Sequence, residues 1–221
     1  MALARCLVLE PALVLLDEPL ANLDVHLRAS MEEEFADFHV RTGTTMVYIT
    51  HDQAEAMALA DRIAVLDHGR IEQVATPSNL HSEPATEMVA GFIGQGMVVP
   101  VEPRGRRSDG RCVVRLLGID LVMRCGRDEP PRGHALACLR TGDLFVAGEG
   151  EPALPGRVTR MIYQAGHFRV EMRPDADPGM KLVLREPEPA RFSPGDSIRI
   201  GIRDGWIIPA RNDPAEGGAP P

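Results

Sequence analysis

The chain has 221 residues, of which 44% are hydrophobic and 25% are charged, which are ordinary proportions for a soluble protein with a buried core. Its net charge of −8 argues against a nucleic-acid-binding protein, because such proteins carry a basic face. No apolar run reaches the ~20 residues that span a bilayer, and the N-terminus lacks the pattern of a secretory signal peptide, so we expect no export.

Charge and composition change near residue 94. Residues 1–94 carry 5 Arg and 15 Asp plus Glu, a net charge of −10, whereas residues 95–221 carry 19 Lys plus Arg and 17 Asp plus Glu. Gly and Pro together number 8 in the first part and 32 in the second. Such a shift is typical of a domain boundary, which we place after residue 94.

The first part alternates apolar runs with helical patterns, which predicts an α/β layer with a parallel sheet. The continuous apolar run 12–16 predicts a strand that is buried on both faces. Apolar residues recur at helical spacing over 25–41, and Gly43 follows as the helix end. The remaining expected elements are a strand at 45–50, a helix at 53–60 with Thr50 and Gln53 as a capping box, a hairpin of 62–66 with 71–75, and short helices at 78–82 and 86–92.

The second part has no long helical pattern, and Gly and Pro separate its short β-like runs. We therefore expect an all-β, OB-like barrel or sandwich with Trp206 in its core or at its edge. The expected strands are 98–101, 111–116, 119–125, 136–140, 154–163, 168–172, 181–184, 197–202 and 206–208.

Three smaller features of the sequence remain. The basic run 104–107 is broken by a glycine and is expected to be an exposed loop. The four cysteines form no CxxC pair, so we expect all of them to be reduced; they are Cys6, Cys112, Cys125 and Cys138. Residues 213–221 are polar and rich in Gly and Pro, which predicts a disordered tail.

Acidic and histidine side chains follow two of the predicted strands. Asp17 and Glu18 end the first strand, and neighbouring strand residues point to opposite sides, so the two carboxylates can take different tasks. His51 follows the second strand and would lie beside the acids if the strands are neighbours. Carboxylates suit Mg²⁺ or a general base, and a histidine can donate to a phosphoryl oxygen. Together these residues indicate phosphoryl transfer to water.

At this point the sequence resembles a known family. Residues 1–94 resemble the C-terminal half of the P-loop-type ATPase domain of ABC transporters, and residues 95–212 resemble the TOBE-type β domain of importer ATPases. In the ATPase part, the matching segments are 2–5 for the helix that follows the signature motif in the family, 14–19 for the Walker B strand, 20–24 for the D-loop and 48–53 for the H-loop. In the TOBE-type part, they are 156–158 and 191–196.

The resemblance implies ATP and Mg²⁺ as cofactors and a role for each matching residue. Asp17 would support Mg²⁺ through water, and Glu18 would be the general base for the attacking water. His51 would contact the γ-phosphate. Asp24 and its D-loop would reach across a dimer interface, and Gln53 is a weaker candidate for nucleotide contact.

The resemblance also implies partners and a location. Importers of this kind, for spermidine/putrescine, ferric iron, sulfate, phosphonate or sugars, place two ATPase subunits as a homodimer against membrane permease subunits. An extracytoplasmic solute-binding protein takes part indirectly, and no nucleic acid is involved. The ATPase would be cytoplasmic and peripheral on the inner face of the cytoplasmic membrane, where it energises solute uptake.

Two motifs of that family have no counterpart here. The sequence has no G-x-x-x-x-G-K-[ST] run, its only lysine is Lys181, and it has no signature motif. We therefore expect an N-terminally truncated ATPase that is inactive alone. The alternative is a non-catalytic regulatory, anion-binding or partner-binding module derived from such a subunit.

Overall fold

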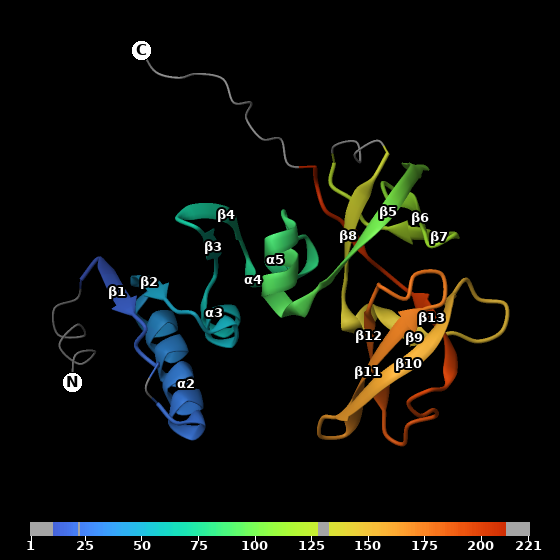
Figure 1. Ribbon diagram of the computed structural model, residues 1–221. Coiled ribbons are helices and arrows are strands. Elements are labelled where there is room, and N and C mark those ends of the chain that lie inside the picture. Colours follow the sequence, from blue (N-terminus) through green and yellow to red (C-terminus); the bar gives the residue numbers. More distant parts are fainter. Residues whose placement is uncertain (1–10, 22, 128–132, 211–221) are drawn as a thin grey trace, which may run out of the picture. The chain divides into compact units, whose positions relative to one another are not determined.

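The computed structural model describes residues 11–21, 23–127 and 133–210 (Figure 1). By packing, the chain divides into two compact units, residues 1–80 and 81–221. The assignment of 1–94 to an ATPase part and of 95–212 to a TOBE-like part concerns ancestry and stays a prediction. The matching segment 2–5, Cys6 and the tail 213–221 lie outside the described residues. Within the described ranges, no helix combines the length and the hydropathy that crossing a bilayer requires.

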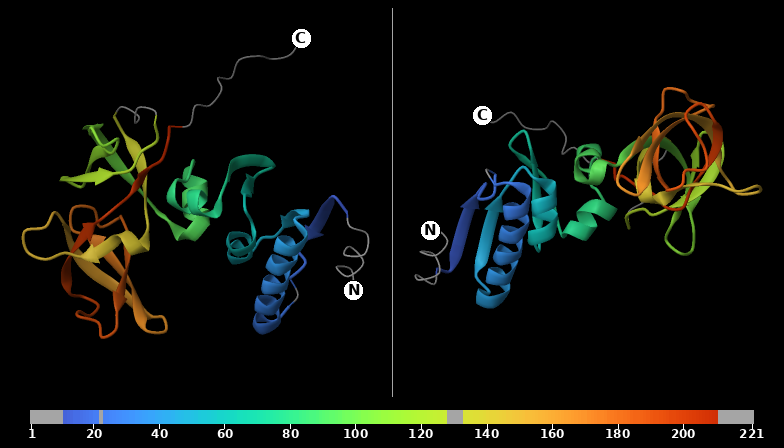
Figure 2. Two further views of the ribbon diagram at one scale, coloured as in Figure 1. Left: turned by 180° about the vertical axis from the view of Figure 1, so that it is seen from behind. Right: turned by 90° about the horizontal axis from the view of Figure 1, so that it is seen from below.

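The first unit is built on two parallel strands. Strands β1 (Leu13–Asp17) and β2 (Thr45–Ile49) pair in parallel, and helix α2 (Val25–Thr42) connects them and lies along one face of the pair (Figures 1 and 2). The α2 side chain Phe35 is buried and meets the ring of Tyr48 on β2 edge to face, with 6.1 Å between the ring centroids. The predicted order of strand, helix and strand is confirmed.

The other face of this strand pair is exposed. Leu13 is 48% exposed and Leu15 is 70% exposed, and both lie opposite residues of β2 whose side chains are also exposed. The prediction of a strand buried on both faces is therefore wrong for β1. Within the described residues α2 covers only the side to which the buried Val14 points.

The rest of the first unit follows the predicted order. Helix α3 (Gln53–Leu59) is followed by the antiparallel strands β3 (Ile63–Asp67) and β4 (Arg70–Ala75), and by helix α4 (Pro77–Ser82). The hairpin turn places His68 and Gly69 at positive φ, as a two-residue turn between twisted strands requires.

The second unit holds two five-stranded sheets that share one hydrophobic core (Figure 2). The expected antiparallel barrel or sandwich is confirmed. One sheet has the order β14-β8-β5-β6-β7, from strands β5 (Met97–Arg106), β6 (Cys112–Leu116), β7 (Ile119–Met123), β8 (Ala135–Leu139) and β14 (Trp206–Ile207). The other has the order β12-β11-β10-β13-β9, from strands β9 (Leu144–Val146), β10 (Leu154–Tyr163), β11 (His167–Pro174), β12 (Leu182–Pro187) and β13 (Ser197–Ile202).

Two details of these sheets differ from expectation. Strand β9 was not predicted, because three residues carry too little periodicity to stand out. The basic run 104–107 was expected to be a loop, but β5 continues through Arg106 and pairs with β6. A register shift between Pro103 and Gly105 lets the strand pass its glycine.

A buried arginine joins the helical segment 81–95 to the β-rich unit. Arg140 follows β8, and its guanidinium donates hydrogen bonds to the carbonyl oxygens of His81, Ala90 and Ile93. These carbonyls lie at the ends of α4 and of α5 (Glu87–Phe92), where helices leave carbonyl groups without an intrahelical partner; the Ala90 carbonyl also accepts from the Gly96 amide. The confirmed core residue Trp206 adds a bond from its indole nitrogen to the Pro84 carbonyl, at 3.0 Å.

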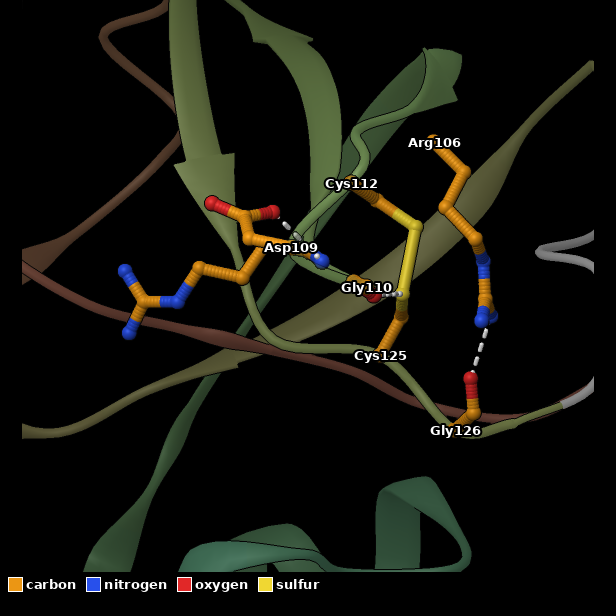
Figure 3. The surroundings of a disulfide bond; sticks show 7 residues. Arg106, Asp109, Gly110, Cys112, Cys125 and Gly126 are labelled. Atoms are coloured by element: carbon orange, nitrogen blue, oxygen red, sulfur yellow. Dashed lines mark hydrogen bonds between the residues drawn. A yellow bond between two sulfur atoms is a disulfide. The ribbon is translucent and has the colours of Figure 1, made fainter.

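The second unit also contains a disulfide. Cys112 at the start of β6 is bonded to Cys125, just beyond β7 (Figure 3). The expectation of reduced cysteines is wrong for this pair, because it considered only cysteines close in sequence. Antiparallel pairing sets Cys112 opposite Met123 and so brings together two cysteines 13 residues apart. Cys138 is a free, buried thiol.

Removal of the Arg140 side chain should destabilise the second unit. Arg140→Met removes five guanidinium donors from this junction and leaves the buried Ile93 carbonyl without its side-chain donor, so the free energy of unfolding should fall by about 2 kcal/mol. Urea denaturation followed by the fluorescence of Trp206, the only tryptophan, measures it. The exposed Arg127→Met is the matched control, and equal stability of the two variants would contradict the role of Arg140.

Reduction of the disulfide should also destabilise this unit. Opening a loop of this length costs about 3 kcal/mol, because the reduced unfolded chain gains freedom. The same urea titration with and without a phosphine reductant measures the difference. The double variant Cys112→Ala, Cys125→Ala should show no effect of the reductant. An unchanged midpoint for the unsubstituted chain would contradict the prediction.

Candidate functional site

The parallel register brings the carboxyl ends of β1 and β2 to one edge. Asp17 lies beside Ile49, and the next residue continues the pairing, since the Glu18 amide donates to the Ile49 carbonyl at 2.9 Å. The residues that follow the two strands, Glu18 and His51, therefore emerge side by side.

Glu18 and His51 form a direct contact. The Nδ1 atom of His51 lies 2.8 Å from Oε1 of Glu18, and the side chains are 76% and 47% exposed, respectively. This confirms the expectation that the histidine lies beside an acid. The hydrogen bond and the negative charge of Glu18 raise the pKa of His51. Because an ionised carboxylate only accepts, Nδ1 of His51 is the donor, and Nε2 is the ring nitrogen left to face a ligand.

The other predicted site residues have different surroundings. Asp17 ends β1 with an exposed side chain on the face opposite α2. Asp24 is the N-cap of α2, where its carboxylate accepts hydrogen bonds from the amides of His26 and Leu27 at 3.0 and 2.9 Å. Gln53 is the first residue of α3. The structure thus joins Glu18 to His51, and the roles of all five candidates stay predictions.

The capping of α3 differs from the predicted capping box. The N-cap is Asp52, whose Oδ1 accepts from the amides of Ala54 and Glu55. Thr50 instead accepts from the Asp52 amide at 2.9 Å and donates to Glu55 at 2.8 Å. The box was misplaced because aspartate and threonine both cap helices, and the sequence alone did not tell which of the two does so here.

A half-buried polar cluster with the buried Glu55 at its centre was not predicted. Its residues are Arg28, Tyr48, Thr50, Asp52 and Glu55. Glu55 is a buried carboxylate within an alanine-rich helix, a charged residue where the pattern favours an apolar one. That exception was the available signal, but it does not identify the partners, which come from α2 and β2.

The donor set fits a magnesium ion better than it fits a nucleotide. Asp17 and Glu18 offer hard oxygen ligands, and Mg²⁺ needs only one or two carboxylates when phosphates and waters supply the rest. Within the described ranges no cluster of three or more Asp, Glu, His or Cys could hold a metal by itself. A triphosphate would meet two carboxylates here and a single histidine, so it needs further cations or amide donors to bind.

Comparison with known proteins gives the relationship. No family model matches the chain. It is 36% identical over 206 residues to the Fe(3+) ions import ATP-binding protein FbpC of Rhizobium etli, covering 93% of this chain and 57% of that protein. It is 41% identical over 203 residues to the sn-glycerol-3-phosphate import ATP-binding protein UgpC of Paracoccus denitrificans, covering 89% and 54%.

The chain spans about half the length of the curated relatives it matches. Over most of its own length it is homologous to importer ATP-binding proteins, which confirms the resemblance drawn from its motifs. Among solved structures it is similar to the cytoplasmic molybdate-binding protein ModG with molybdate bound, at a TM-score of 0.35 and 15% identity, over 53% of this chain and 89% of that one.

Removing the charge of Glu18 should lower the pKa of His51. In Glu18→Gln the histidine loses its ionised acceptor, so the pKa should fall from its raised position toward about 6.5. Nuclear magnetic resonance of ¹⁵N-labelled histidine measures the titration. His68 lies in the turn between β3 and β4, away from Glu18, and is the internal control, whose signals should be the same in both proteins. An unchanged His51 curve would contradict the contact.

Proposed function

We propose that the first unit carries the hydrolytic half of the nucleotide site of an importer ATPase. The observation that supports this most directly is the 2.8 Å contact of Glu18 with His51 at the carboxyl ends of two parallel strands. Homology to importer ATP-binding proteins over most of the chain supports it independently.

Each side chain has a distinct role in this proposal. Glu18 is the general base, and its carboxylate accepts the proton of the water that attacks the γ-phosphate. His51 donates from Nε2 to a phosphoryl oxygen, and its raised pKa keeps more of the ring positively charged near neutral pH. Asp17 holds Mg²⁺ through water, and the ion neutralises phosphate charge when it is bound.

The charge of the site explains why the chain should need a complement. Residues 1–94 have a net charge of −10, and the only lysine, Lys181, belongs to the second unit. A phosphate-binding Gly-rich loop would supply amide donors and a lysine, and the sequence has no such run. We infer that this chain alone binds nucleotide negligibly and is inactive.

The exposed face of the β1–β2 pair supports the same inference. Leu13, Leu15, Val47 and Ile49 present apolar side chains on the face opposite α2. An apolar patch of this kind marks a surface that another protein segment covers. In the assembled ATPase we expect that segment to come from the sequence that precedes the matched region in the relatives.

The assembled ATPase would act as a dimer of two such subunits. Its partners would be membrane permease subunits and, through them, a solute-binding protein. It would be peripheral on the cytoplasmic face of the membrane. Asp24 would reach across the dimer interface, and Gln53 would lie near the nucleotide.

A nucleotide titration tests the proposal. Labelled ATP with Mg²⁺ should show no saturable binding to the chain alone up to millimolar concentration, because the site lacks a cationic cradle. Co-expression with the upstream half of the Rhizobium etli relative should restore micromolar binding. Micromolar binding by the chain alone would contradict the need for a complement. Failure to bind in the co-expressed complex would favour the non-catalytic module.

A further inference from the structure

We propose that Arg28 and Glu55 form a positioning pair that directs His51 toward Glu18 and connects it to Leu23, just before α2. The inference rests on the proposed function, since it assigns these two residues to the same site. Neither residue is proposed to touch a ligand; both would act through the main chain on each side of the histidine.

Glu55 is the centre of this arrangement. Its side chain is only 4% exposed, and its Oε2 accepts hydrogen bonds from the hydroxyl groups of Thr50 at 2.8 Å and Tyr48 at 3.1 Å. Burial and the charge of Glu55 raise the pKa of Tyr48, so this phenol stays a donor throughout the ordinary pH range. Two hydroxyl groups at the end of β2 thus fix the carboxylate, while the main chain of Glu55 belongs to α3.

Both chain neighbours of His51 are fixed to this pair. Thr50 donates to Glu55 and accepts from the Asp52 amide, while Asp52 caps α3 and accepts from Arg28 Nη1 at 3.3 Å. The histidine ring itself is mostly exposed, and the contact described for it is with Glu18. Its direction is therefore set by the backbone of 50–52.

Arg28 extends the connection to the other motif. Its Nη2 donates to the carbonyl of Leu23 at 3.4 Å, and its Nε is buried 3.7 Å from Glu55 Oε1. One guanidinium therefore contacts the segment before α2, the cap of α3 and the buried carboxylate. Leu23 and the histidine loop should consequently move as one body.

An ion pair with one buried partner is a costly way to gain stability, because apolar residues of similar size often stabilise such a site equally well or better. What an apolar pair would not reproduce is the directed set of bonds to Thr50, Asp52 and Leu23. This contrast separates positioning from simple stabilisation. The double variant Arg28→Met, Glu55→Leu should keep the fold, but its His51 ring should no longer be held toward Glu18.

The test uses the full chain labelled with ¹⁵N-histidine and needs no nucleotide. In the double variant the Nδ1 signal of His51 should lose the shift of a hydrogen-bonded donor. The His51 pKa should fall at least half of the way to its value in Glu18→Gln, which is more than the loss of the minor charge effect of Glu55 alone would give. The double variant Glu34→Gln, Arg41→Met removes one exposed acidic and one exposed basic side chain from α2 and is the matched control. It should leave His51 unchanged.

A milder variant covers the case in which the double variant does not fold. Thr50→Val removes only the hydroxyl between the histidine loop and Glu55, and it should shift His51 in the same direction by a smaller amount. A wild-type His51 signal and titration in a folded Arg28→Met, Glu55→Leu protein, or in Thr50→Val when the double variant is unfolded, would overturn the proposal. The His51 measurement does not depend on nucleotide binding. The positioning role of Arg28 and Glu55 and the proposed function can therefore be contradicted independently.

Discussion

The parallel pairing of β1 with β2 is the constraint on which the proposed site depends. Parallel strands end at the same edge of a sheet, so the residues after them become neighbours although they are far apart in sequence. Here the amide of Glu18 extends the pairing by one further bond to Ile49. That bond sets the position from which Glu18 meets His51, 33 residues further along the chain.

Electrostatics and packing both support the proposal that this site works together with a further polypeptide segment. The edge that carries Asp17 and Glu18 is acidic, which a triphosphate tolerates only when donors and cations surround it. The adjoining face of the strand pair exposes Leu15 and Ile49, and an exposed apolar surface of this kind marks a place where another segment packs. The second unit contrasts with this, because its two sheets bury one common core and its helical segment is held by Arg140.

The sequence allowed the order of elements to be predicted because hydrophobic periodicity is local. The helix over 25–41, its end at Gly43 and the hairpin around His68 all follow from neighbouring residues.

The predicted burial of β1 on both faces was wrong, since burial depends on what covers a strand. The pairing of Cys112 with Cys125 and the contacts of Glu55 depend on which elements become neighbours, and no local pattern contains that information. The proximity of Glu18 and His51 was predictable once two strands were assumed to be adjacent.

The rate of a single turnover tests the central claim most directly, because it isolates the step assigned to Glu18. The chain would be co-expressed with the upstream half of the Rhizobium etli relative, and phosphate release from bound ATP would be timed. The account predicts that Glu18→Gln binds ATP but hydrolyses it about 10²- to 10⁴-fold more slowly, while the exposed Glu34→Gln hydrolyses at the unsubstituted rate. Hydrolysis by Glu18→Gln at that same rate would contradict the account.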